Sequence, residues 1–202
     1  MSRTLPPVIL ASASQSRAKL LAGAGIAFTA IPSAIDESAV KDALWAEEAT
    51  ALQCAEALAE LKALKVSHAH PEALVIGADQ LLDCHGKWYD KPPTIMAARD
   101  HLASLGGKTH LLPTAAVVAM NGVPVWRHVS APRLTMRTLD EDFIAAYIER
   151  AGASILQSVG AYQLEGLGVQ LFQAVEGDFF TVLGLPLLPL LGFLREHGLG
   201  LS

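Results

Sequence analysis

Three serines and an arginine near the N-terminus have the types and spacing needed to bind an anion. Ser12, Ser14, Ser16 and Arg17 directly follow a short apolar run at residues 8–11. The run predicts a buried strand, and the serines are typical of a helix N-cap. A strand that leads into a helix presents free backbone N–H groups, hydroxyl groups and a guanidinium at one place, and such groups bind phosphate. The structural alternative is a serine-rich cap followed by a surface arginine.

A carboxylate, Asp79, follows a second apolar run at residues 73–77. Open α/β sheets bind their ligands beyond the C-terminal ends of strands, which is where this run would place Asp79. A carboxylate there can bind a divalent cation or accept a proton from an attacking water. The structural alternative is an aspartate that serves a turn at the strand end.

Two lysines are further candidates for the same site. Lys62 lies late in a long predicted helix, and Lys91 precedes two prolines. Taken alone, each would be a solvated surface lysine. No cluster of histidine with cysteine or glutamate predicts a transition-metal site, and the sequence contains neither a dinucleotide fingerprint nor a Walker A loop. Phosphate chemistry would therefore depend on single cations and carboxylates brought together by the fold.

The elements that would position these residues alternate between strands and helices, and hairpins follow later in the chain. Helices are predicted at residues 17–22, 42–66, 92–105 and 138–150 and after Pro186. Further strands are predicted at residues 27–31, 114–120, 123–129, 134–137, 158–162, 170–175 and 179–183, with a hairpin at 80–89. Asn121 and Gly122 are the strongest hairpin signal. This pattern predicts a mixed α/β fold whose central sheet is not purely parallel.

The predicted helix at residues 42–66 has an apolar stripe. Its expected inward face comprises Leu52, Ala55, Leu58, Leu61 and Lys65.

Composition limits the kinds of protein that the chain can be. Its 202 residues, 51% of them hydrophobic, suffice for one domain spanning residues 1–202, with two lobes around one core as the alternative. A net charge of −5 without a basic block argues against a nucleic acid polymer as partner. Cys54 and Cys84 have no paired spacing, which predicts free thiols in a reducing cytoplasm. The apolar stretch at residues 183–194 is too short for a membrane span.

The order of these segments along the chain resembles the Maf family of nucleotide pyrophosphatases. The similarity runs from about residue 8 to residue 195. The motifs that carry it are residues 10–17 with 20–21, 36–37, 59–63, 77–80 with 91–92, 107–110 with 114, 160–162, 165–166, 177–178 and 184–186. Several motifs in the same order are far more specific than any one of them.

The resemblance implies an elongated mixed α/β fold, with a central sheet flanked by helices and a deep cleft, and commonly a homodimer. It implies hydrolysis of a nucleoside triphosphate to the monophosphate and diphosphate, with a divalent cation, Mg²⁺ or Mn²⁺. Asp79 would be the catalytic acid/base and, with Glu37, a metal ligand. The phosphate-binding residues would be Ser12, Ser14, Arg17, Lys62 and Lys91. Water attack on phosphorus needs charge neutralisation and an oriented water, which this set would supply.

Three positions bear on the choice of base. Gln80 and Glu165 resemble the branch of the family that acts on 7-methyl-GTP, whereas pyrimidine enzymes tend to carry Thr and Gln there. A carboxylate can accept hydrogen bonds from guanine N1–H and the exocyclic amine. At Ser16 the sequence departs from this branch, which often has Trp.

Two other classes of function are alternatives. One is a non-catalytic nucleotide-binding regulator, because the family has been linked to cell division and septum formation. A pure binder has no need of a water-activating carboxylate such as Asp79, which argues against it. The other is an α/β interaction domain, which does not explain why polar motifs gather at strand ends.

Overall fold

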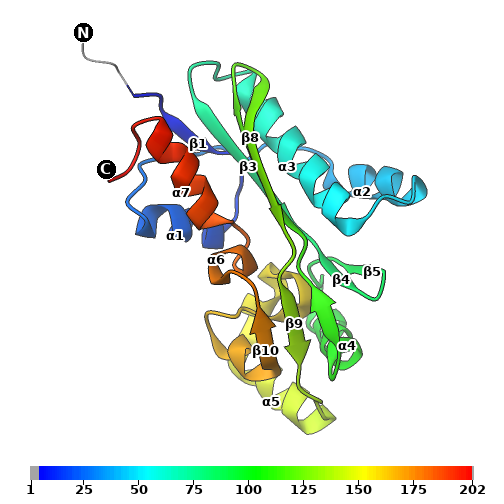
Figure 1. Cartoon of the computed structure of the whole chain (residues 1–202). Coiled ribbons are helices and arrows are strands. Elements are labelled where there is room, and N and C mark those ends of the chain that lie inside the picture. Colours follow the sequence, from blue (N-terminus) through cyan, green and yellow to red (C-terminus); the bar gives the residue numbers. More distant parts are fainter. Residues whose placement is uncertain (1–4, 202) are drawn as a thin grey trace. The chain divides into compact units, whose positions relative to one another are not determined.

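The computed structural model describes residues 5–201 and shows a mixed α/β protein made of two compact units (Figure 1). The first unit is built from the segments Met1–Gln80, Thr114–Ser130 and Gly184–Ser202. The second is built from Leu81–Pro113 and Ala131–Leu183. The prediction of a mixed α/β fold is confirmed, whereas the elongated shape and the deep cleft stay predictions.

The sheet of the first unit has five strands in the order β2-β1-β3-β7-β8. They are β1 (Val8–Leu10), β2 (Thr29–Ala30), β3 (Leu74–Gln80), β7 (Thr114–Met120) and β8 (Val123–Ser130). β1 runs parallel to both β2 and β3, while β7 and β8 continue the sheet with antiparallel pairing. The predicted hairpin is therefore present. Asn121 and Gly122 at its turn have φ of 52° and 70°, the backbone that two-residue hairpin loops require.

Four helices belong to the described part of the first unit. They are α1 (Gln15–Gly23), α2 (Glu37–Ala46), α3 (Ala51–Ser67) and α7 (Leu187–Glu196). The prediction of a single helix at residues 42–66 is wrong. Helix α2 ends at Ala46, Glu48 adopts a φ of 56°, and Thr50 is the N-cap of a new helix, α3. Thr50 and Gln53 cap each other's backbone in a capping box. This signal lay inside a run of alanine, leucine and glutamate that looks helical throughout.

The buried face of α3 differs from the predicted one by about one residue. Leu61 and Lys65 are exposed, whereas Lys62 and Ala63 are buried. The cause is Gly77 in β3, where an added Cβ would lie 2.6 Å from the backbone nitrogen of Ala63. Glycine thus allows the backbone of α3 to lie directly on β3. This contact turns Lys62 toward the sheet.

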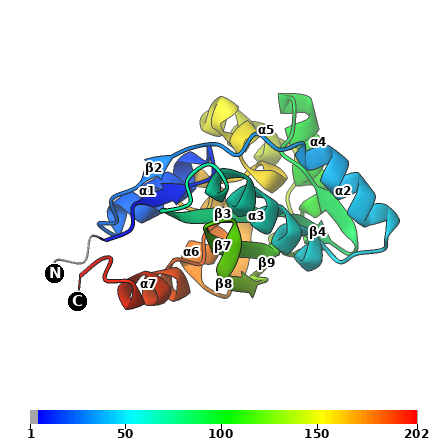
Figure 2. The same ribbon diagram turned by 90° about the horizontal axis from the view of Figure 1, so that it is seen from above.

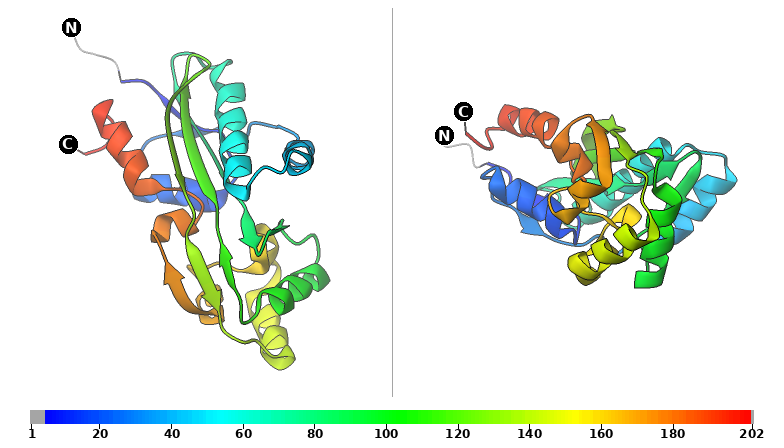
Figure 3. Two further views of the ribbon diagram at one scale, coloured as in Figure 1. Left: turned by 45° about the vertical axis from the view of Figure 1, so that its right-hand side comes forward. Right: turned by 90° about the horizontal axis from the view of Figure 1, so that it is seen from below.

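The two faces of this sheet are covered by different helices, as the turned views show (Figures 2 and 3). On one side Arg127 of β8 forms ion pairs with Glu56 and Glu60 of α3. On the other side its neighbour Trp126 stacks on Phe193 of α7, with ring centroids 5.6 Å apart. Alternation along β8 therefore directs successive side chains to opposite layers.

The second unit contains an antiparallel sheet in the order β10-β9-β6-β4-β5. Its strands are β4 (Leu82–Cys84), β5 (Lys87–Tyr89), β6 (Thr109–Leu111), β9 (Arg133–Met136) and β10 (Phe172–Glu176). Its helices are α4 (Ile95–Leu105), α5 (Glu141–Ala151) and α6 (Phe179–Val182), with 3₁₀ helices at Gly152–Gln157, Val159–Ala161 and Leu167–Leu171. Its core is largely apolar, and the buried side chains of His110, Tyr147 and Tyr162 are among those that contribute polar groups to it.

Two predicted strands of the second unit are wrong. Residues 158–162 form 3₁₀ turns, because Gly160 and Ala161 adopt φ of 76° and 62° and cannot continue a strand. Residues 179–183 form α6, because Asp178 accepts hydrogen bonds from the backbone and hydroxyl of Thr181 and so caps a helix. Cys54 and Cys84 are both buried and are not joined by a disulfide. Among residues 5–201, no helix combines the length and apolarity needed to cross a bilayer.

Candidate active site

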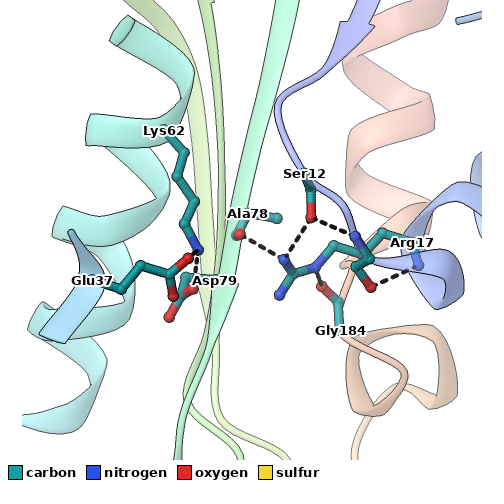
Figure 4. Close-up of polar contacts among 8 residues, drawn as sticks. Ser12, Arg17, Glu37, Lys62, Ala78, Asp79 and Gly184 are labelled. Atoms are coloured by element: carbon teal, nitrogen blue, oxygen red, sulfur yellow. Dashed lines mark hydrogen bonds and ion pairs between the residues drawn. The ribbon is translucent and has the colours of Figure 1, made fainter. Parts of the chain in front are cut away.

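The centre of the candidate site is the ammonium group of Lys62, which contacts two carboxylates (Figure 4). Its Nζ donates to Oδ1 of Asp79 at 2.6 Å and lies 2.8 Å from Oε1 of Glu37. The side chains of Lys62 and Asp79 are each 7% exposed, whereas that of Glu37 is 46% exposed. A buried cation therefore holds one buried carboxylate and one that reaches solvent.

Three elements of the first unit supply these groups. Asp79 is the penultimate residue of β3, and Lys62 comes from the buried face of α3. Glu37 is the first residue of α2, which Asp36 caps by accepting a hydrogen bond from the Ala39 N–H at 3.1 Å. This hydrogen bond, together with one from Ser38, lowers the pKa of Asp36. Of the acidic pair expected in a loop, Asp36 thus builds the helix and Glu37 reaches the site.

On the other side of β3, the β1–α1 turn brings together two serines and Arg17 (Figure 4). Ser12 Oγ accepts a hydrogen bond from the Ser14 N–H at 3.1 Å and another from Nη1 of Arg17 at 3.3 Å. Ser14 caps α1 by accepting from the Arg17 N–H at 3.4 Å. Ser16 lies in the first turn of α1 and is partly buried. The turn presents hydroxyl groups at a helix N-terminus, as anion binding requires.

Arg17 carries a positive charge close to the carboxylates. Removal of the guanidinium from water lowers its pKa, and the negative charges of Asp79 and Glu37 act in the opposite direction. The charged form is kept, because an arginine remains protonated at neutral pH.

Gln80, the last residue of β3, is held by a threonine of the neighbouring strand. Its Nε2 donates to Thr114 Oγ1 at 2.9 Å, and Thr114 is fully buried. This contact fixes the plane of the Gln80 amide. The sequence singled out Thr114 only as part of a motif. The antiparallel pairing of β3 with β7 places Gln80 opposite Thr114 and so brings the two side chains together.

The first unit thus brings together seven of the residues that the sequence singled out. They are Ser12, Ser14, Arg17, Glu37, Lys62, Asp79 and Gln80. Lys91 and Glu165 belong to the second unit, where both are exposed; Lys91 follows β5, and Glu165 lies in a turn. Two functional groups were missed, the backbone carbonyls of Ala78 and Gly184, both of which accept hydrogen bonds from Arg17. Every residue has a backbone carbonyl, so the identity of a residue cannot indicate which carbonyl accepts such a bond.

Most of the chain matches one known protein family. The profile of the Maf-like protein family matches residues 7–197. The chain belongs to the Maf-like protein family. A nucleoside triphosphate pyrophosphatase of Rhodospirillum rubrum is 52% identical over 202 residues, covering 100% of both chains.

Other relatives of this Maf-like protein carry the same or a narrower name. A nucleoside triphosphate pyrophosphatase of Paramagnetospirillum magneticum is 55% identical over 94% of this chain and 98% of its own. A 7-methyl-GTP pyrophosphatase of Rhizobium etli is 50% identical over 96% of this chain and 97% of its own. The resemblance stated from the motifs is therefore confirmed at the level of the family.

Proposed function

We propose that this Maf-like protein is a nucleoside triphosphate pyrophosphatase that cleaves the bond between the α- and β-phosphates. The observation that carries the proposal is the buried Lys62 ammonium between Asp79 and Glu37, across β3 from the serine-rich turn. The names of the relatives from Rhodospirillum rubrum and Paramagnetospirillum magneticum support the reaction class.

The reaction would be attack by water on the α-phosphorus. A new bond forms between the water oxygen and phosphorus, the α,β-bridging P–O bond breaks, and its electron pair leaves with diphosphate. Asp79 would accept the proton of the water. Lys62 contacts Oδ1, which leaves Oδ2 for the water.

The phosphate chain would be held by hydroxyl groups and by positively charged side chains, the two kinds of group that the sequence predicted. Ser12 and Ser14 supply hydroxyls at the N-terminus of α1, and Lys62 supplies positive charge across β3 from them. Positioned cations act on a triphosphate by neutralising charge that grows on the leaving group. Lys91, from the second unit, is proposed as a further phosphate ligand.

The carboxylates fit a divalent cation of the hard, oxygen-binding kind. Among residues 5–201, no group of three or more His, Cys, Asp or Glu side chains converges, but Mg²⁺ typically binds one or two carboxylates and takes its other ligands from water and substrate phosphates. Asp79 and Glu37 lie close to each other, since both contact Lys62 Nζ, and the cation would bind between them beside the ammonium. We propose that they hold Mg²⁺ or Mn²⁺, which would withdraw charge from the phosphate oxygens.

For the base, we propose a modified guanine nucleotide such as 7-methyl-GTP. The name of the Rhizobium etli relative supports this choice, as do Gln80 and Glu165. The hydrogen bond from Gln80 Nε2 to Thr114 holds the side-chain amide in place, and an amide oxygen is a group that can accept from a base N–H. Ser16 is the third position that we propose contributes to specificity.

The test is diphosphate release from 7-methyl-GTP, GTP, dTTP, UTP, CTP and ITP with Mg²⁺ or Mn²⁺, for wild type, Asp79→Asn and Asp42→Asn. We expect turnover by wild type and a loss of about 10²–10⁴-fold in Asp79→Asn. Asp42 is an exposed aspartate of α2 and serves as the matched control, which should keep full activity. Asp79→Asn should fold, because the asparagine Oδ1 can still accept from Lys62.

Two results would contradict the proposal. One is absence of diphosphate release from every nucleotide by folded wild type, which would favour a nucleotide-binding regulator. The other is full activity of Asp79→Asn. Removal of metal with EDTA should abolish turnover, and Mg²⁺ or Mn²⁺ should restore it. Turnover that survives EDTA would refute the metal while leaving the reaction intact.

A further inference from the structure

Three of the five N–H donors of the Arg17 guanidinium bind acceptors of the chain itself. Its Nε donates to the Gly184 carbonyl at 2.8 Å, and its Nη1 donates to the Ala78 carbonyl at 2.8 Å and to Ser12 Oγ at 3.3 Å (Figure 4). One side chain therefore joins the β1–α1 turn, the end of β3 and the segment before α7. Hydrogen bonds from a charged donor are roughly twice as strong as those from a neutral donor.

The bond to Ala78 completes an edge of β3 that β1 leaves open. Alternate residues of β3 face β1: the Leu74 N–H donates to the Pro7 carbonyl, and the Ala11 N–H donates to the Ile76 carbonyl. Ala78 is the next residue in this row, but β1 ends at Leu10 and the chain turns into α1. Arg17 Nη1 supplies the donor that a longer β1 would have supplied. A buried carbonyl in that place would otherwise lose a hydrogen bond.

The bond to Gly184 depends on the absence of a side chain there. Gly184 has a φ of +99°, and an added Cβ would lie 3.4 Å from Arg17 Nε. Glycine thus lets the backbone present its carbonyl to the guanidinium at close range. The segment that leads into α7 is fixed to the same group that fixes the end of β3.

We propose that Arg17 is a positioning residue, which holds the end of β3 and thereby the Asp79 carboxylate in the geometry that water attack requires. This inference rests on the proposed function, in which Asp79 is the base. Ala78 precedes Asp79 directly, so a shift of the Ala78 carbonyl moves the Asp79 backbone. A misplacement of about 1 Å can cost about 10²-fold in rate even when the substrate still binds. A phosphate ligand would behave differently, because its removal weakens binding.

The test compares Arg17→Lys and Arg17→Met with wild type. We expect kcat to fall about 10²-fold in both. The dissociation constant for a non-hydrolysable α,β-methylene nucleoside triphosphate should stay unchanged. Lysine keeps the charge but has one donor group at its end and cannot bridge the two carbonyls, so it should not restore kcat. Arg127→Met removes a surface arginine of β8 that pairs with Glu56 and Glu60, and this control should match wild type in both measurements.

A second measurement reads the positioning without turnover. Amide hydrogen exchange should be faster at residues 76–80 and 184–187 in both Arg17 variants and unchanged in Arg127→Met. Weaker analogue binding with kcat kept, or recovery of kcat in Arg17→Lys, would overturn the proposal and make Arg17 a phosphate ligand. Unchanged exchange at both segments would overturn it as well. Faster exchange in the Arg17 variants of a protein without any turnover would support the anchoring of β3 by Arg17 and would refute the proposed function instead.

Discussion

The substitution Lys62→Met tests whether the ion pair between Lys62 and Asp79 is as buried as the structure shows. Methionine has nearly the length of lysine and fills the same space on α3, but it removes the ammonium. Asp79, with a side chain that is 7% exposed, would then lack its counter-charge. A buried carboxylate without a partner loses hydration that nothing in the protein replaces.

The size of the effect follows from the exposure of the two partners. Removing one member of a buried ion pair typically costs about 3–5 kcal/mol. The Glu37 side chain is 46% exposed, so solvent screens its charge and its share is small. We therefore expect the free energy of unfolding to fall by about 3 kcal/mol, the lower end of the range.

The assay is urea unfolding of wild type, Lys62→Met, Asp79→Asn and the double variant. In the double variant both charges are gone, so most of the loss seen in Lys62→Met should be recovered. Lys65→Met is the matched control on the same helix, because Lys65 is exposed and only donates to the Ala34 carbonyl at 2.8 Å. It should cost about 1 kcal/mol or less. A loss below 1 kcal/mol in Lys62→Met, or an additive double variant, would refute the buried pairing.

Two further predictions concern packing and pH. Gly77→Ala should lower the free energy of unfolding by about 1–3 kcal/mol and reduce turnover, because the new methyl would lie 2.6 Å from the Ala63 nitrogen. Urea unfolding and an assay of diphosphate release measure the two effects. Unchanged stability would contradict the close contact between β3 and α3. His110, whose pKa burial lowers from 6.5 to about 4, should contribute about 3 kcal/mol of stability above pH 6.5 that is lost as the pH falls to about 4. His110→Gln should show a smaller loss between pH 7 and pH 4 in urea unfolding, and an equal loss would exclude His110 as its source.

Much of the fold could be predicted because its signals are local. The hairpin at Asn121 and Gly122 depends on two adjacent residues that tolerate positive φ, and β1 and β3 are short apolar runs. The failures have a local cause as well. Residues 179–183 are apolar and resemble a strand, but the cap formed by Asp178 and Thr181 starts a helix instead. A capping signal outweighs strand propensity when the segment has only one turn.

The residues of the site could be selected by motif, but their contacts could not be derived from it. Lys62 was expected to be a surface lysine on spacing alone, and it is buried because Gly77 admits the backbone of α3. Glu37 was expected in a loop, and it reaches Lys62 because Asp36 starts a helix there. These contacts depend on pairs that are distant in sequence. Only the three-dimensional packing decides them.

The small residues around Lys62 are therefore as much a part of the site as its charged groups. Gly77 in β3 faces Ala59 and Ala63 of α3, and all three lack the bulk that would separate helix and strand. Lys62 lies between the two alanines in sequence, and Asp79 lies two residues after Gly77. A larger residue at any of the three positions would move the ammonium away from the carboxylate. Backbone packing thus brings Lys62 within reach of Asp79, and the hydrogen bond between them has a length of 2.6 Å. Electrostatic attraction then strengthens a contact that the packing has already made.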